Sequence, residues 1–237
     1  MSFEQHAFNA FILEHNVIGF FEKPVVLKSG RTSCWYVNWR NVASDVYLMD
    51  ELSQFVISFI KQLVSDKKLS QLPRCLYGVP EGATKLGILC QYKLAKEDSS
   101  YAKGSHILSM GRAKPKEHGV ANDKYFVGMP EGKTVVLEDT TTTGGSLLST
   151  LDALIEANVE VVAALGLTNR MELRDDRLSV EQAVATKISK NIPVKYFYMS
   201  SALELLPKAV EKFKPSKSII QSIETEFNDF GISPIRF

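Results

Sequence analysis

The stretch that most constrains this chain is residues 135–146, which read VVLEDTTTTGGS. Apolar residues lead into two adjacent carboxylates, four threonines, two glycines and a serine, and apolar residues at helical spacing follow. A second apolar run occupies residues 159–170. This order predicts a strand, a tight loop, a helix and a second strand, with the chemistry at the carboxyl end of the first strand.

The composition of this loop suits a sugar phosphate. Gly144 and Gly145 accept positive φ and let an anion approach the backbone, where the unpaired N–H groups of a helix N-terminus favour negative charge. Glu138 and Asp139 would repel a phosphate, but they suit sugar hydroxyls or a hydrated divalent cation. The simpler alternative is a capped helix after an acidic strand end. Neither GxxxxGK[ST] nor GxGxxG occurs in the loop.

The segment resembles the ribose-phosphate loop of type I phosphoribosyltransferases. In that family two acidic residues end a strand, and a loop rich in threonine and glycine holds the 5′-phosphate. The resemblance implies that Glu138 and Asp139 hold the ribose hydroxyls, with Glu138 at a place where many members have aspartate. It assigns the phosphate to seven residues: Thr140, Thr141, Thr142, Thr143, Gly144, Gly145 and Ser146.

Two further segments resemble the orotate phosphoribosyltransferase branch of this family. LKSGRTSCWYVN matches its N-terminal pattern LKSGRxSxxxxN, which implies base-side roles for Lys28 and Tyr36, with Cys34 where a proline is usual. In LTNRME, Arg170 matches an arginine that faces the base carboxylate, and Asn169 replaces the usual aspartate. A guanidinium suits a carboxylate bidentately. Without the resemblance, Lys28 could equally be an exposed lysine of an ordinary hairpin, and Arg170 could be a surface arginine at a strand end.

A basic segment, GRAKPKEHG, resembles the catalytic loop RKExKDHG of the same family. Arg112, Lys116 and His118 align with its functional positions, where they would neutralise the leaving diphosphate. The family's second basic residue is Ala113 here, and Lys114 is a candidate replacement for it. Such a loop could close over an anion and exclude water, although a solvated basic loop would have the same composition.

The turn in LYGVPEGATKLG departs from the family pattern. A strand that ends at a glycine and opens into a helix offers backbone N–H groups to a diphosphate. The family carries a lysine in this turn, whereas this chain has Glu81 and Gly82, with Lys85 three residues later. An acid at a diphosphate site is unfavourable unless it points away or meets the metal. We therefore expect weaker diphosphate binding rather than a different reaction.

The pattern of elements predicts an α/β fold of the type I phosphoribosyltransferase kind, because helices alternate with strands from about residue 49 onward, which favours a mostly parallel sheet flanked by helices. We expect a small N-terminal hood at 1–48, a core at 49–200, and C-terminal helices at 201–237 packed on the core, in one domain overall. Helices are expected at 3–16, 49–65, 82–97 and 179–190, and strands at 72–79, 106–111 and 194–199.

Charge and cysteine content limit the possible partners and compartments. A net charge of +1 gives no reason to expect a nucleic-acid or membrane surface. No apolar stretch approaches the roughly 18 residues that a membrane helix needs, and no basic leader precedes an apolar core at the N-terminus. The cysteines Cys34, Cys75 and Cys90 are scattered without a CxxC pattern, so a reducing, cytoplasmic location is expected.

The resemblance implies transfer of ribose 5-phosphate from 5-phosphoribosyl 1-diphosphate to orotate, giving orotidine 5′-monophosphate and diphosphate. It implies Mg²⁺ held largely by the substrate, and a homodimer in which loop 111–128 completes the partner's site. Because C1′ becomes oxocarbenium-like, the protein contributes positioning and charge stabilisation. We expect a separate polypeptide to decarboxylate the product.

Two alternatives stay open at the level of sequence. One is a phosphoribosyltransferase for uracil or a purine, against which Arg170 and Lys28 argue. The other is a non-catalytic regulator or binding module on the same fold, for which Ala113 and Glu81 argue. Diphosphate release in the presence of orotate separates that module from the enzyme, and a panel of bases separates the two kinds of enzyme.

Overall fold

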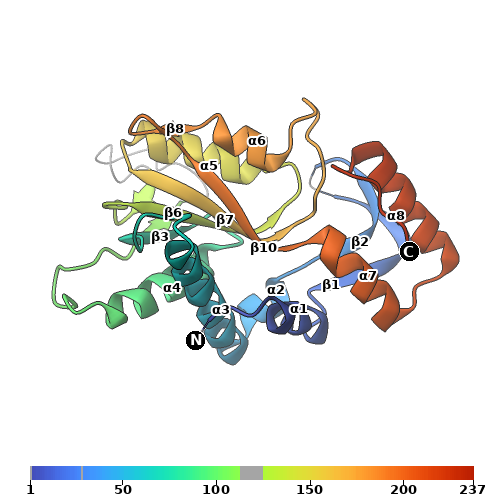
Figure 1. Ribbon diagram of the computed structural model, residues 1–237, viewed down its shortest axis with the longest axis horizontal. Helices are drawn as coiled ribbons and strands as arrows, with labels where there is room; N and C mark the ends of the chain where they lie inside the picture. Colours follow the sequence, from blue (N-terminus) through green and yellow to red (C-terminus); the bar gives the residue numbers. More distant parts are fainter. Residues whose placement is uncertain (1, 28, 113–124) are drawn as a thin grey trace.

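The centre of the protein is a parallel sheet. The computed structural model describes residues 2–27, 29–112 and 125–237. Across the sheet the strands follow the order β10 (Lys195–Ser201), β7 (Val161–Asn169), β6 (Thr134–Thr141) and β3 (Cys75–Gly78), as Figure 1 shows. All three strand pairs are parallel. The expected α/β fold with a mostly parallel sheet is confirmed.

Helices cover both faces of the sheet. One face carries α5 (Gly145–Glu156) and α6 (Val180–Ala185), and the other carries α3 (Val46–Ser65) and α4 (Thr84–Glu97) (Figure 1). Side chains of β6 alternate between the two resulting cores: Val135 and Leu137 enter one, and Val136 enters the other. A strand buried on both faces reads as a continuous apolar run, which explains the sequence before Glu138.

Local signals set the helix boundaries. Asp45 caps α3, because its carboxylate accepts a hydrogen bond from the Leu48 N–H at 3.0 Å. In α5, Leu147, Leu151 and Leu154 are fully buried on one face. This spacing holds α5 against the sheet and directs its N-terminus to the carboxyl edge, where β6 ends.

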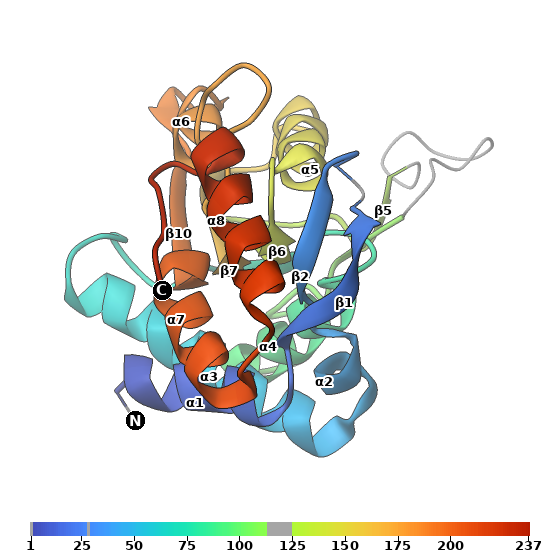
Figure 2. The same ribbon diagram turned by 90° about the vertical axis from the view of Figure 1, so that its right-hand side faces the viewer.

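The N-terminal segment forms a hood beside the sheet edge. It comprises α1 (Gln5–Glu14), the antiparallel strands β1 (Ile18–Val26) and β2 (Thr32–Val37), and α2 (Arg40–Ser44). Of the last two helices, α7 (Ala202–Phe213) contacts both β10 and β1, and α8 (Lys217–Phe230) lies against β1 and β2 (Figure 2). The division at residues 48 and 200 stays a prediction.

Two elements are shorter than expected. The helix predicted at 179–190 ends at Ala185, and the chain continues into a hairpin whose two-residue turn is formed by Lys190 and Asn191 at positive φ (48° and 66°). The hairpin strands are β8 (Ile188–Ser189) and β9 (Ile192–Pro193). Within the predicted strand 106–111, only β4 (Met110–Gly111) is paired, with β5 (Phe126–Val127).

Candidate active site

Two adjoining cavities lie at the carboxyl edge of the sheet. The loop pocket, of about 960 Å³, is bounded by the β6–α5 loop, the turn after β3, and Arg112. The hood pocket, of about 500 Å³, is bounded by β1, β2 and the start of α2. Five residues line both pockets: Ser29, Arg40, Asp139, Thr140 and Thr142. A ligand with two different ends could therefore occupy both pockets at once.

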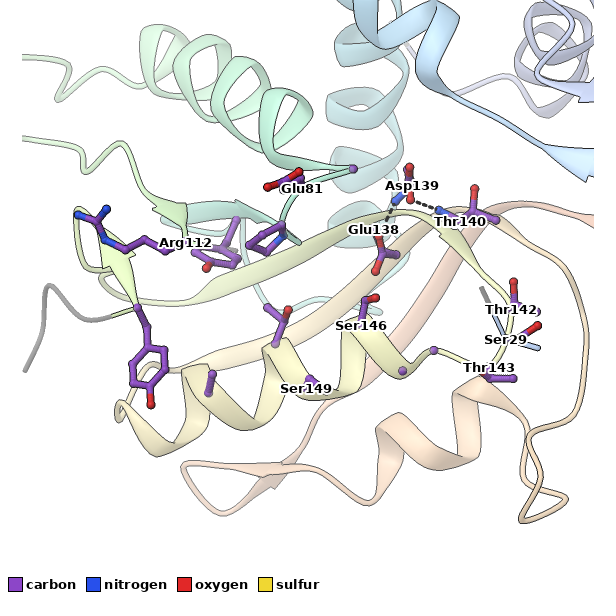
Figure 3. A pocket seen from close by; sticks show the side chains of 18 of the residues that line it. Ser29, Glu81, Arg112, Glu138, Asp139, Thr140, Thr142, Thr143, Ser146 and Ser149 are labelled. Carbon is purple, nitrogen blue, oxygen red and sulfur yellow. Dashed lines mark hydrogen bonds between the residues drawn. The ribbon is translucent and has the colours of Figure 1, made fainter. Parts of the chain in front are cut away.

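Two carboxylates stand at the end of β6. Figure 3 shows Glu138 directed toward Ser146 at the start of α5, and Asp139 directed to the opposite side of the strand. The backbone hydrogen-bonds to both: the Asp139 N–H donates to Glu138 Oε1 at 3.2 Å, and the Thr140 N–H donates to Asp139 Oδ1 at 2.7 Å. Both side chains line the loop pocket, where their oxygens suit sugar hydroxyls or a hydrated Mg²⁺.

The N-terminus of α5 opens into the loop pocket. Gly144 is its N-cap, with a φ of 72°, and no side-chain cap is formed in this described segment. The first amide groups of α5 can therefore meet an anion. Six of the seven predicted phosphate-loop residues line the pocket: Thr140, Thr142, Thr143, Gly144, Gly145 and Ser146.

The seventh, Thr141, lines neither pocket. It is 1 % exposed, and its Oγ1 lies 2.6 Å from the hydroxyl of Tyr196. Burial raises the pKa of Tyr196, so this hydroxyl stays protonated at neutral pH. This hydrogen bond turns the Thr141 side chain toward Tyr196 of β10 and away from the loop pocket. Thr141 therefore holds the start of the loop to β10 through its hydrogen bond with Tyr196.

The turn after β3 comes close to the end of β6. A Cβ atom added to Gly82 would lie 2.6 Å from Asp139 Oδ2, so only glycine leaves space for this carboxylate. Glu81 lines the loop pocket, where its carboxylate would repel an anionic ligand, as expected from the sequence. Lys85 offers no compensation there, because it lines neither pocket and its Nζ donates to the Ala43 carbonyl at 3.0 Å.

Tyr36 is the predicted base-side residue that lines the hood pocket from β2. Its ring centroid lies 4.9 Å from that of Phe21, and its hydroxyl occupies the space that a side chain at Gly19 would need. Glycine at this position of β1 therefore lets the tyrosine lie across the hairpin. The result is an aromatic wall suited to a planar ring.

The basic-loop residues are placed only in part. Arg112 lines the loop pocket, and its backbone N–H donates to the Tyr125 carbonyl at 2.9 Å. Lys116 and His118 lie outside the described residues, as do Ala113 and Lys114. Lys28 also lies outside them.

Arg170 occupies a buried charge cluster behind the hood pocket. Its Nε donates to Glu172 at 2.7 Å, its Nη2 donates to Glu226 at 2.9 Å, and its guanidinium stacks 3.6 Å from the Trp35 ring centroid. Arg31 pairs with the second oxygen of Glu172 at 3.0 Å. Although Arg170 lines the hood pocket, it is only 2 % exposed. Its charge is already matched by the two glutamates.

Asn169 has a backbone role in this position. Its Oδ1 accepts a hydrogen bond from the Met171 N–H at 2.8 Å, and Met171 has a positive φ of 60°. A short polar side chain that bonds to the backbone two residues later stabilises such a turn. The replacement of the family's aspartate thus preserves the bend after Arg170.

Sequence reasoning missed two arginines at the site. Arg174 donates from Nη1 to the Thr143 carbonyl at 2.8 Å and from Nε to Asp176 at 3.2 Å, so it braces the β6–α5 loop. The hydrogen bond from Arg174 lowers the pKa of Asp176, which keeps this pair charged. Arg40 lines both pockets. Its only signal in the sequence was its position four residues after Tyr36.

Comparison with known sequences finds orotate phosphoribosyltransferases. The chain is 32% identical over 156 residues to an orotate phosphoribosyltransferase of Bradyrhizobium diazoefficiens, covering 62% of this chain and 74% of that one. It is also 32% identical over 161 residues to an orotate phosphoribosyltransferase of Sorangium cellulosum, covering 65% and 74%. No family model matches the chain.

Comparison with solved structures supports the fold. Orotate phosphoribosyltransferase from Francisella tularensis superimposes with a TM-score of 0.62 at 19% identity, covering 95% of this chain and 99% of that one. The Mycobacterium tuberculosis enzyme, solved with 5-phospho-α-D-ribosyl 1-diphosphate, gives a TM-score of 0.53 at 16% identity, covering 85% and 98%. These structures share the architecture of a parallel sheet between helices.

Proposed function

The chain belongs to the orotate phosphoribosyltransferase family, and from this premise we propose that the loop pocket and the hood pocket together form its active site. The enzyme transfers ribose 5-phosphate from 5-phosphoribosyl 1-diphosphate to orotate, releasing diphosphate. The observation that carries the site assignment is the wall shared by the two pockets, where Asp139 and Thr140 face both. Formation of orotidine 5′-monophosphate together with diphosphate tests the function, and the absence of both products would overturn it.

On the phosphate side, the proposal assigns the 5′-phosphate to the loop 140–146 and the ribose hydroxyls to Glu138 and Asp139. The uncapped N-terminus of α5 supports the first assignment, since its amide groups and partial positive charge favour an anion. The position of both carboxylates in the loop pocket supports the second. As the bond from C1′ to diphosphate breaks, these fixed contacts hold the ribose while positive charge develops on it.

For the leaving diphosphate, the proposal assigns Arg112, Lys116 and His118. Arg112 supports it by lining the loop pocket. We also propose a homodimer in which loop 111–128 of one subunit completes the site of the other. The basic side chains of this loop would then neutralise the negative charge of the leaving diphosphate only after the substrate has bound.

For the base, the proposal assigns Lys28, Tyr36 and Arg170. Tyr36 lines the hood pocket, where its ring can lie against a flat pyrimidine. Arg170 reaches the same pocket from behind, within its cluster of glutamates. This arrangement supports a base site whose wall Arg170 shapes by stacking on Trp35.

We further propose Mg²⁺ as the cation of the reaction, held mainly by the diphosphate and the ribose hydroxyls. Glu138, Asp139 and Glu81 all line the loop pocket and offer the oxygen atoms that this ion prefers. The ion would neutralise the diphosphate when bound. The protein would contact it largely through its waters.

We propose a cytoplasmic location. The three cysteines are free and buried, as a reducing compartment allows. Along the described ranges, no helix combines the length and apolar character that crossing a membrane requires.

Lys116→Ala is expected to lower turnover by about 100-fold, because a cation facing the leaving diphosphate would be lost. The melting temperature should stay within a degree or two of the wild type, as measured by calorimetry. Lys103→Ala, which removes an exposed lysine from another loop, is the matched control. If catalysis and melting temperature fell together, Lys116 would have a structural role instead.

Arg174→Gln is expected to raise the KM for 5-phosphoribosyl 1-diphosphate by about threefold to tenfold, since the Thr143 carbonyl loses its charged donor and the phosphate loop loosens. The KM for orotate should change less. Steady-state kinetics with each substrate varied separately checks this, with the exposed Arg177→Gln as control. Equal changes in both KM values would argue against a role confined to the loop.

A further inference from the structure

The two described arginines that line the hood pocket, Arg40 and Arg170, differ in whether a carboxylate pairs with their charge. Arg170 is paired with Glu172 at 2.7 Å and with Glu226 at 2.9 Å. Arg40 is exposed at the pocket, and its side chain forms no ion pair or hydrogen bond with any residue that the structure describes. Within the described part of this pocket, Arg40 is therefore the arginine whose guanidinium has no carboxylate partner.

The backbone of Arg40 is held firmly at the pocket wall. Its N–H donates to Asn38 Oδ1 at 3.1 Å, and it lies between Trp39 and Val42, which are both buried. Lys85 ties the next turn of α2 to α4 through the Ala43 carbonyl. A long side chain rooted in a fixed backbone loses less freedom when it binds a ligand.

Two further donors at this pocket have no partner among the residues that the structure describes. Trp39 Nε1 and Ser29 Oγ are buried side-chain atoms without a hydrogen-bond partner among the described residues, and both residues line the hood pocket. An indole N–H can only donate, and a buried donor is normally satisfied. Together with Arg40, they give the hood pocket a set of donors that suits an oxygen-rich, anionic ligand.

We propose that Arg40 receives the carboxylate of orotate, with Trp39 and Ser29 as donors to other oxygens of the ligand. The inference rests on the proposed function and names a specificity residue for it. A guanidinium fork matches a carboxylate with two parallel hydrogen bonds. Asp139 also lines this pocket and would repel the carboxylate, so an unpaired cation is needed nearby.

The deciding variant is Arg40→Gln, which keeps a polar side chain and removes the charge. We expect kcat/KM for orotate to fall by about 10- to 100-fold, as loss of a charged hydrogen-bonded pair implies, with the KM for 5-phosphoribosyl 1-diphosphate within about twofold of the wild type. Arg40→Lys should recover only part of the loss, because an ammonium group lacks the fork. Lys23→Gln, an equal charge change on an exposed position of β1, should leave both values unchanged.

The result that overturns the inference is a wild-type enzyme active on orotate whose Arg40→Gln variant keeps the orotate KM. An equal loss for both substrates, or a larger loss for the diphosphate substrate, would also overturn it, since Arg40 lines the loop pocket too. Calorimetric binding of orotidine 5′-monophosphate tests Arg40 without turnover: weaker binding by the variant supports the inference, and unchanged binding refutes it. A wild type that neither turned over orotate nor bound this nucleotide would refute the proposed function itself, and the inference with it.

Discussion

Asp139→Asn should lower kcat/KM by about 100- to 1,000-fold while the protein remains folded. The amide has the shape of the carboxylate, and its oxygen can still accept the hydrogen bond from the Thr140 N–H that Asp139 accepts at 2.7 Å. What disappears is the negative charge at the wall between the two pockets. In the proposed mechanism that charge stabilises the ribose as it becomes oxocarbenium-like, so we expect the loss to appear in the transition state.

Steady-state kinetics combined with circular dichroism checks this prediction. Asp152→Asn is the matched control, because the same change is made on α5 in a carboxylate that pairs with Lys187 at the surface. A near-normal rate for Asp139→Asn would remove Asp139 from the catalytic group. An unfolded variant would show instead that this carboxylate stabilises the turn at Gly82.

Arg170→Ala should lower the free energy of unfolding by about 3–5 kcal/mol, because it leaves Glu226 buried without its cation. Glu172 would keep its ion pair with Arg31. Burial raises the pKa of Glu226, and Arg170 opposes that shift. In the Arg170→Ala variant the pKa of Glu226 rises further, because the opposing cation is gone. The variant therefore keeps its stability below the ordinary glutamate pKa of about 4.3, where Glu226 is protonated, and loses it as the pH rises above that value. Urea unfolding at several pH values measures this dependence.

The same variant should raise the KM for orotate more than that for 5-phosphoribosyl 1-diphosphate, since Trp35 and the hood pocket lose their support. Arg170→Met combined with Glu226→Gln is the control, because removal of both charges avoids an unpaired buried ion and should restore much of the stability. A stable Arg170→Ala variant would contradict the proposed energetics of the cluster. A larger effect on the diphosphate substrate would contradict its base-side position.

The structure extends what the sequence predicted for the site. Adjacent residues such as Glu138 and Asp139 could be placed together from sequence, because a strand followed by a glycine loop and a helix has one common geometry. The contact of Gly82 with Asp139 could not, since it joins two strands that are neighbours only in the sheet. The hydrogen bond between Thr141 and Tyr196, which are far apart in the chain, also keeps Thr141 out of both pockets, although its neighbours in the loop are threonines too.

The sequence by itself determined the fold class, the phosphate-loop motif and the family resemblance, because these depend on periodicity and on residues close together in the chain. The tertiary structure decided which charges are paired at the hood pocket. Arg170 reads as a free arginine in LTNRME, and only the packing of α8 brings Glu226 to it. Arg40 reads as a surface residue, and only the meeting of hood and sheet edge puts it beside both pockets. Electrostatic pairing depends on distance in space, which a local sequence pattern does not contain.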